Sequence, residues 1–150
     1  MGWIAACALA GAAIAAPAPR TAELDGLIAR ARIEGQVDAW CAGEFQPGRR
    51  GAYAIALRAL TGGGQYAVLG TSTAPAVLAT YKDGADLACY TPAEAKAMNK
   101  LIAGNRTMHG GIAPKWGGTV VCGFVEATNA VCWQYSPTAR AFVKVGEWIT

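Results

Sequence analysis

Residues 119–145 read TVVCGFVEATNAVCWQYSPTARAFVKV, and this stretch decides the fold class. It contains three apolar, β-prone runs that are separated by short polar turns and that lie at 119–125, 130–135 and 141–145. Runs of this length bounded by turn residues predict strands, and brief connections make consecutive strands antiparallel. The stretch therefore predicts a three-stranded meander, whose last strand can extend as far as Trp148.

Four more short strands are predicted on the N-terminal side of the meander, at 52–60, 65–70, 76–81 and 86–90. Segments rich in Gly, Thr, Ser and Asp separate them, as turn residues do between strands. With the meander included, the chain is expected to form about six to seven short strands.

Two segments predict helices. The sequence TPAE at 91–94 supplies an N-cap, a proline at the first helical position and a capping box, so a helix should run from here to about Ile102. A second helical pattern begins at Thr21, and its apolar spacing continues past Gly35 through residues 37–41. We therefore expect an α+β fold in which a mainly antiparallel β-sheet is packed by one or two helices.

Four cysteines lie in the predicted domain: Cys41, Cys89, Cys122 and Cys132. Cys122 and Cys132 flank the first turn of the meander and would face each other across that hairpin. We expect them to form one disulfide, which leaves Cys41 and Cys89 for a second by elimination. Two disulfides are typical of proteins that function outside the reducing cytoplasm.

The N-terminus predicts export. Residues 4–16 are apolar and uncharged, too short for a membrane span but typical of a secretory signal, and Ala13 and Ala15 form a cleavage pattern. No Lys or Arg precedes this run, which is unusual for a signal. We expect residues 1–16 to be a signal peptide, residues 17–150 to be a single globular domain, and the protein to be periplasmic or secreted.

Cys7 allows another reading of the N-terminus. Ile4-Ala5-Ala6-Cys7 has the pattern of a bacterial lipobox, in which the cysteine receives a lipid. Only six residues precede Cys7, so this alternative requires translation to start upstream. The protein would then be lipid-anchored.

Composition excludes several classes of function. The net charge of +3 comes from dispersed residues without a basic run beyond Arg49-Arg50, which argues against nucleic-acid binding. No second apolar span follows the signal, so no transmembrane segment is expected in the mature chain. Cysteine and histidine pairs at zinc-site spacing and cofactor motifs are absent, so we predict neither a metal nor a cofactor.

The glycine-rich connection at 103–117 carries the residues that we expect to bind a ligand: His109, Lys115 and Trp116. Trp116 lies between Pro-Lys and Gly-Gly pairs, which favours exposure, and exposed tryptophans anchor protein partners or stack on sugars. His109 is followed by two glycines and is expected at a turn.

We expect this domain to be a non-catalytic protein-binding, inhibitory or cell-envelope accessory module. A carbohydrate- or peptidoglycan-binding domain that takes an envelope glycan is the first alternative. The second is a cysteine hydrolase with Cys89 as nucleophile and His109 as base, which requires Cys89 to be a free thiol. A disulfide to Cys41 would remove that nucleophile, so the sequence favours a role without catalysis.

Overall fold

The structure, a computed structural model, describes residues 20–82 and 85–150. The expected signal peptide, its cleavage pattern and Cys7 lie outside the described residues. Within the described part, no helix combines the length and the apolar character needed to cross a membrane.

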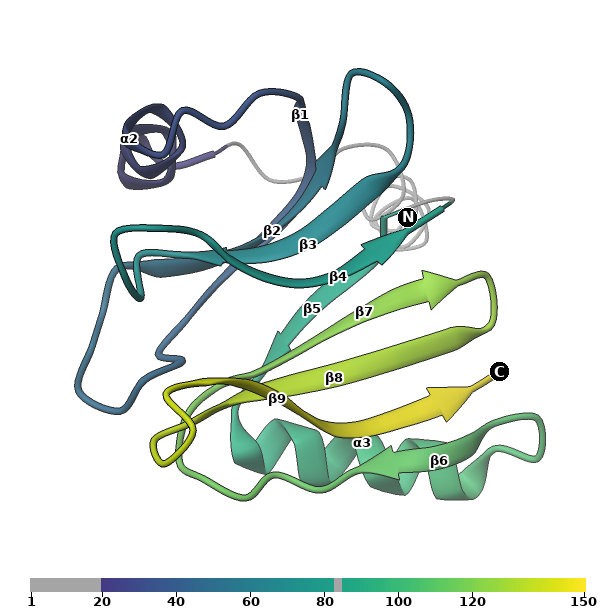
Figure 1. Cartoon of the computed structure of the whole chain (residues 1–150). Helices are drawn as coiled ribbons and strands as arrows, with labels where there is room; N and C mark the ends of the chain where they lie inside the picture. The colour runs from purple at the N-terminus through teal and green to yellow at the C-terminus, as the bar shows by residue number, and fades with distance from the viewer. Residues whose placement is uncertain (1–19, 83–84) are drawn as a thin grey trace, which may run out of the picture.

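Four layers build the molecule: a helix, two antiparallel sheets and a second helix (Figure 1). The first sheet has the order β1-β2-β3-β4, with β1 at Gln36–Gly43, β2 at Ala52–Arg58, β3 at Gly64–Leu69 and β4 at Ala76–Tyr81. The second has the order β5-β7-β8-β9-β6, with β5 at Leu87–Tyr90, β6 at His109–Ile112, β7 at Val120–Glu126, β8 at Asn129–Ser136 and β9 at Ala141–Ile149. Helix α2 spans Ala22–Arg30 and helix α3 spans Pro92–Gly104.

The side chains of each strand alternate between the two faces of its sheet, and this alternation explains the order of the layers. In β2, Tyr53 and Ile55 pack with Leu24 of α2, whereas Ala52 and Ala54 join the core between the two sheets. Successive side chains of a strand point to opposite faces, so a strand that is apolar at every position is buried on both sides. Each sheet thus has one face on its partner sheet and the other under a helix.

Tyr66 joins the sheets at the centre of the molecule. Its hydroxyl donates to the carbonyl oxygen of Phe124 at 2.7 Å, and the carbonyl oxygen of Asp86 lies 3.3 Å away. A Cβ atom at Gly123 would lie 2.7 Å from the Tyr66 ring, so glycine gives the ring its space. Burial raises the pKa of Tyr66 to about 12.

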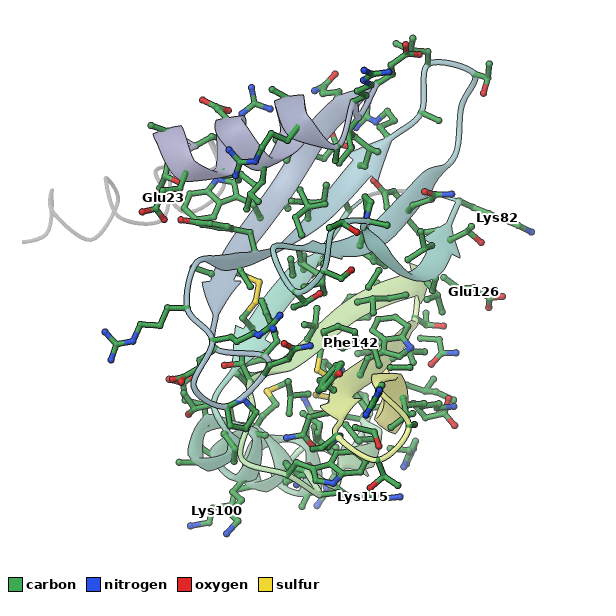
Figure 2. The ribbon with its side chains drawn as sticks, turned by 60° about the vertical axis from the view of Figure 1, so that its left-hand side comes forward. Glu23, Lys82, Lys100, Lys115, Glu126 and Phe142 are labelled. Atoms are coloured by element: carbon green, nitrogen blue, oxygen red, sulfur yellow. A yellow bond between two sulfur atoms is a disulfide. The ribbon has the colours of Figure 1, made fainter. Side chains whose placement is uncertain are left out.

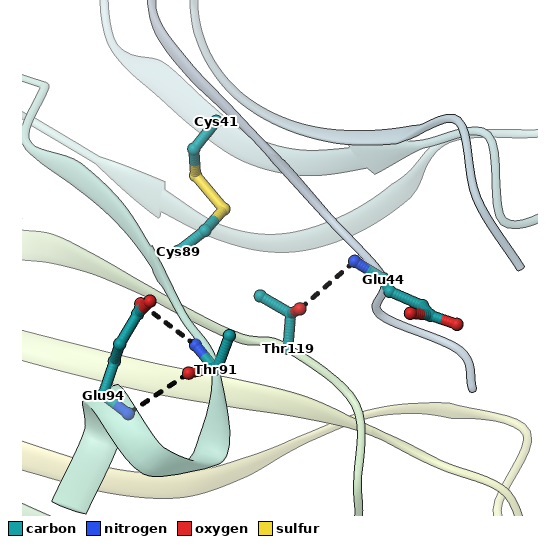
Figure 3. The surroundings of a disulfide bond; sticks show 6 residues. All are labelled: Cys41, Glu44, Cys89, Thr91, Glu94 and Thr119. Carbon is teal, nitrogen blue, oxygen red and sulfur yellow. Dashed lines mark hydrogen bonds between the residues drawn. A yellow bond between two sulfur atoms is a disulfide. The ribbon is translucent and has the colours of Figure 1, made fainter. Parts of the chain in front are cut away.

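Both predicted disulfides are confirmed. Cys41 and Cys89 join β1 to β5, and therefore the first sheet to the second, whereas Cys122 and Cys132 join the neighbouring strands β7 and β8. Figure 3 shows the first bond beside the start of α3, where the Thr91 hydroxyl accepts from the Glu94 amide and the Glu94 carboxylate accepts from the Thr91 amide. This is the expected capping box.

The α+β class is confirmed, but the described residues form nine strands in two sheets rather than about six to seven in one. The two unexpected strands are β1 and β6. Helix α2 ends at Arg30, so the prediction that it continues through residues 37–41 was wrong. The chain reverses instead through Arg32 and Gly35, whose φ angles are 53° and 119°.

Candidate functional site

A buried glutamine fixes the loop that carries two of the predicted binding residues. The Gln134 side-chain oxygen accepts from the amides of Lys115 at 2.9 Å and Trp116 at 3.2 Å. Its side-chain nitrogen donates to the carbonyl oxygens of Trp116 and Gly118, both at 2.8 Å. Gln134 is fully buried, so these bonds replace water and hold the loop against β8.

Lys115 and Trp116 are consecutive residues of this loop, whereas His109 lies elsewhere. Lys115 is exposed at the surface (Figure 2), and Trp116 is half-buried against the core under α3. His109 is exposed at the start of β6, opposite Ile149, while the loop with Lys115 follows the other end of that strand. The three residues therefore do not converge on one place.

The expectation that His109 marks a turn was wrong, because the residue begins strand β6. The two glycines after it serve close packing. Gly110 has a φ of 122°, and a Cβ there would collide with the carbonyl oxygen of Glu147. A Cβ at Gly111 would lie 3.1 Å from the side-chain oxygen of Asn99, which covers β6 from α3.

The structure contradicts the cysteine hydrolase alternative. The Cys89 sulfur is bonded to Cys41, so it is not a thiolate nucleophile. Cys89 also lies on β5 and His109 on β6, which are the two outer strands of the second sheet. Four strand spacings separate them, or about 19 Å. A base must reach its nucleophile within hydrogen-bond distance, so the pair is excluded.

A pocket that sequence reasoning did not anticipate opens between α3 and the outer face of the second sheet. Its volume is about 220 Å³. Its walls are mostly apolar, and its large lining side chains are Tyr90, Met98, Met108, Phe124 and Trp148. They come from β5, α3, the loop before β6, β7 and β9, so no local motif could have marked the site.

Acidic side chains make one end of this pocket electrostatically negative. Asp86 is the one charged side chain that lines it among the described residues. Burial raises the pKa of Tyr90, and the carboxylates of Asp86 and Glu94 raise it further. The potential at the Tyr90 end is therefore negative and favours a cation over an anion.

The other tryptophans lie in or against the core. Trp133 packs between the sheets with its ring centroid 6.3 Å from that of Tyr66, and Trp148 is edge-on to Phe124 at 6.2 Å. Trp40 packs beneath α2 against Tyr53. Trp148 also forms part of the pocket wall.

No group of three or more His, Cys, Asp or Glu side chains is placed to hold a metal ion in residues 20–82 and 85–150. No protein-family model matches the chain, and no match was found among curated proteins or solved structures.

Proposed function

We propose that the protein is an exported, disulfide-stabilised binding module whose pocket between α3 and the second sheet receives one large apolar side chain of a protein partner. The two disulfides support export, because such bonds persist in oxidising compartments. The pocket supports the binding role, and it is the observation that carries the proposal.

The size of the pocket favours a side chain over a larger ligand. Sites for drug-sized molecules enclose about 300–1,000 Å³. The pocket holds about 220 Å³, which suits one anchoring side chain of a partner. Interfaces derive much of their affinity from such anchors in well-packed hollows.

The lining defines the partner segment. Met98 and Met108 have flexible, polarisable side chains that adapt to aliphatic or aromatic anchors. Asp86 at the pocket favours a Lys or Arg beside the anchor, because opposite charges across an interface set orientation and specificity. The occupant is therefore a partner segment in which a large apolar residue lies next to a basic residue.

A direct test uses peptides selected from a random displayed library against the oxidised protein. We expect the selected peptides to share a large apolar residue within two positions of Lys or Arg. Methionine-methyl NMR reports the site directly, because Met98 and Met108 are two of only three methionines in the sequence and Met1 is the third. Bound peptide should shift both pocket methyl signals.

Three variants make this test specific. Ala88→Leu fills the pocket and should abolish peptide binding, and Asp86→Asn should weaken it by about tenfold, the effect of losing one charged contact of about 1.4 kcal/mol. Leu101→Ala changes the same helix at a side chain that is 66% exposed and should bind as the unaltered protein does. Unmoved methionine signals, or full binding by Ala88→Leu, would refute the proposed site.

Export is tested separately by sequencing the N-terminus of the protein recovered from the organism that makes it. A start at Pro17 is expected from a signal peptide over residues 1–16, and a start at Ala16, directly after the Ala13 and Ala15 pattern, would equally establish export. A start at Cys7 carrying a lipid would establish the lipid-anchored form instead. A chain that retains Met1 in the cytoplasm would contradict export.

A further inference from the structure

The opposite end of β8 carries a second hollow. Two adjoining depressions of about 290 Å³ and about 490 Å³ lie there and share four lining residues: Gln46, Thr71, Tyr135 and Arg140. Three connections meet at this place, namely β1–β2, β3–β4 and β8–β9. The apolar pocket lies near the start of β8, so the two sites are separate.

The charge of this cleft is positive. Arg49 and Arg140 line it, and none of its lining residues is acidic. Within residues 20–82 and 85–150, neither arginine has a carboxylate within ion-pair distance. Glu44, the acidic residue of the β1–β2 connection, accepts from the Gly48 amide at 2.8 Å instead. Two guanidinium groups therefore face the cleft without an internal counter-ion.

The two arginines are held in different ways. The Arg49 guanidinium donates to the carbonyl oxygen of Thr71 at 3.1 Å, which fixes its direction and leaves other N–H groups for a ligand. Arg140 has a φ of 51°, a left-handed conformation that favours glycine at this place in a hairpin. Strained backbone of this kind is concentrated at functional sites.

Three further lining residues, Tyr135, Gln46 and Ser72, suit a sugar ring, whereas most of the remaining lining residues are apolar. Tyr135 is half-buried, and its ring is held edge-on to Phe142 at 5.6 Å, so it presents a rigid aromatic surface. Gln46 adds an amide side chain that donates to and accepts from hydroxyls, and the Ser72 hydroxyl, which donates to the carbonyl oxygen of Ala74 at 2.7 Å, accepts from a ligand hydroxyl. Arginine forks match carboxylate and phosphate groups through paired hydrogen bonds.

We propose that this cleft binds an anionic saccharide, with its carboxylate or phosphate between Arg49 and Arg140 and its ring on Tyr135. The site goes beyond the proposed protein-binding pocket, because it lies at the other end of β8 and has the opposite charge. It also gives a glycan a place that involves none of His109, Lys115 and Trp116.

The test is a backbone-amide NMR titration of the oxidised protein with three probes: trigalacturonate, glucose 6-phosphate and neutral maltotriose. We expect at least one anionic probe to shift the amides of Thr71, Tyr135 and Arg140, and maltotriose to bind at least tenfold more weakly. Galacturonate alone would identify a carboxylated glycan, and the sugar phosphate alone a phosphorylated one. Raising the salt concentration should weaken binding, because screening reduces the attraction between exposed charges.

Arg140→Gly separates binding from folding. Glycine adopts a positive φ without strain, so this variant should unfold at the same or a higher urea concentration while its affinity falls at least tenfold. Arg49→Gln should lower the affinity by a similar factor. Arg106→Gln, which changes an exposed loop after α3, should leave the affinity unchanged. The proposal is overturned if neither anionic probe binds, if maltotriose binds equally well, or if Arg140→Gly keeps its affinity.

Discussion

Single amide side chains complete the second sheet where the backbone alone cannot. Asn99 donates from its side-chain nitrogen to the carbonyl oxygen of Ile112 at 2.6 Å and accepts from the Ile112 amide at 2.7 Å. These are the two bonds that another strand would make with Ile112 of the outer strand β6. An unpaired strand edge invites association with other chains, so Asn99 protects the edge from within the molecule.

Ionisation of Tyr66 should weaken the fold at high pH. The pKa of Tyr66 is about 12 in the folded protein and about 10 in the unfolded chain, so only the folded state retains the proton between these values. The protonated Tyr66 hydroxyl therefore makes its full contribution to the free energy of unfolding below about pH 10. This contribution is lost as the pH rises towards 12, by up to about 3 kcal/mol. Urea unfolding between pH 8 and 12, with tyrosinate absorbance, measures the slope.

Tyr66→Phe should remove most of this slope, although the variant starts about 1–3 kcal/mol less stable because the carbonyl oxygen of Phe124 loses its donor. Burial also raises the pKa values of Tyr81 and Tyr90, which accounts for a residual slope. A Tyr66→Phe protein with an unchanged alkaline slope would show that ionisation of Tyr66 is not the source of that slope.

Residue roles of this kind were only partly predictable. Thr91 and Glu94 act through neighbours in the sequence, and the capping box was therefore predicted correctly. Gln134 and Asn99 act on backbone 13–19 positions away, so nothing local distinguishes them from exposed polar residues. The pocket side chains are scattered along the chain for the same reason.

At the scale of elements, strand β1 was predicted as helix because a β-bulge reproduces helical spacing. Val37 pairs with Leu57 and Ala39 with Ala56, so Asp38 is the extra residue. The bulge places Val37 and Trp40, three positions apart, on the face beneath α2. Cys41 points to the other face, towards Cys89. A spacing of three in the sequence does not separate a bulged strand from a helix.

Gly35 should be essential for the reversal between α2 and β1. Its φ is 119°, and a Cβ there would collide with the carbonyl oxygen of Arg58. We expect Gly35→Ala to reduce the free energy of unfolding by about 2 kcal/mol. Gly104→Ala is the matched control, because nothing lies within 4 Å of its Cβ position and alanine favours the helix. Equal midpoints of urea unfolding for the two variants would contradict this role.

At the scale of the molecule, the sequence predicted most strands but placed them in one sheet. The chain leaves the first sheet after β4 and enters the second at β5, and these strands do not pair. Both are short and apolar, so neither indicates which sheet it joins. The disulfide pairs were predicted correctly, but the role of Cys41–Cys89 in joining two sheets follows only from the structure.

The two disulfides should differ in their contribution to stability. Closing 48 residues corresponds to about 4 kcal/mol of unfolded-state entropy and closing 10 residues to about 3 kcal/mol. Each bond is isolated by changing the other pair to alanine and measuring urea unfolding with and without reductant. We expect reduction to lower the free energy of unfolding more in Cys122→Ala/Cys132→Ala, which keeps the Cys41–Cys89 bond, than in Cys41→Ala/Cys89→Ala, which keeps the Cys122–Cys132 bond. The reverse order would show that strain or residual structure outweighs loop entropy.

The bond between Cys41 and Cys89 also has a mechanical consequence. Strands β2, β3 and β4 all lie within the segment that it closes. A pulling force applied to the chain ends passes through the sulfur atoms and bypasses these three strands. About 170 Å of extended chain is thereby shielded from the load. A motor that threads proteins from one end would meet a closed covalent loop at this bond. More than one length of chain would then have to enter the channel side by side, and a narrow channel admits the protein only after the disulfide is reduced.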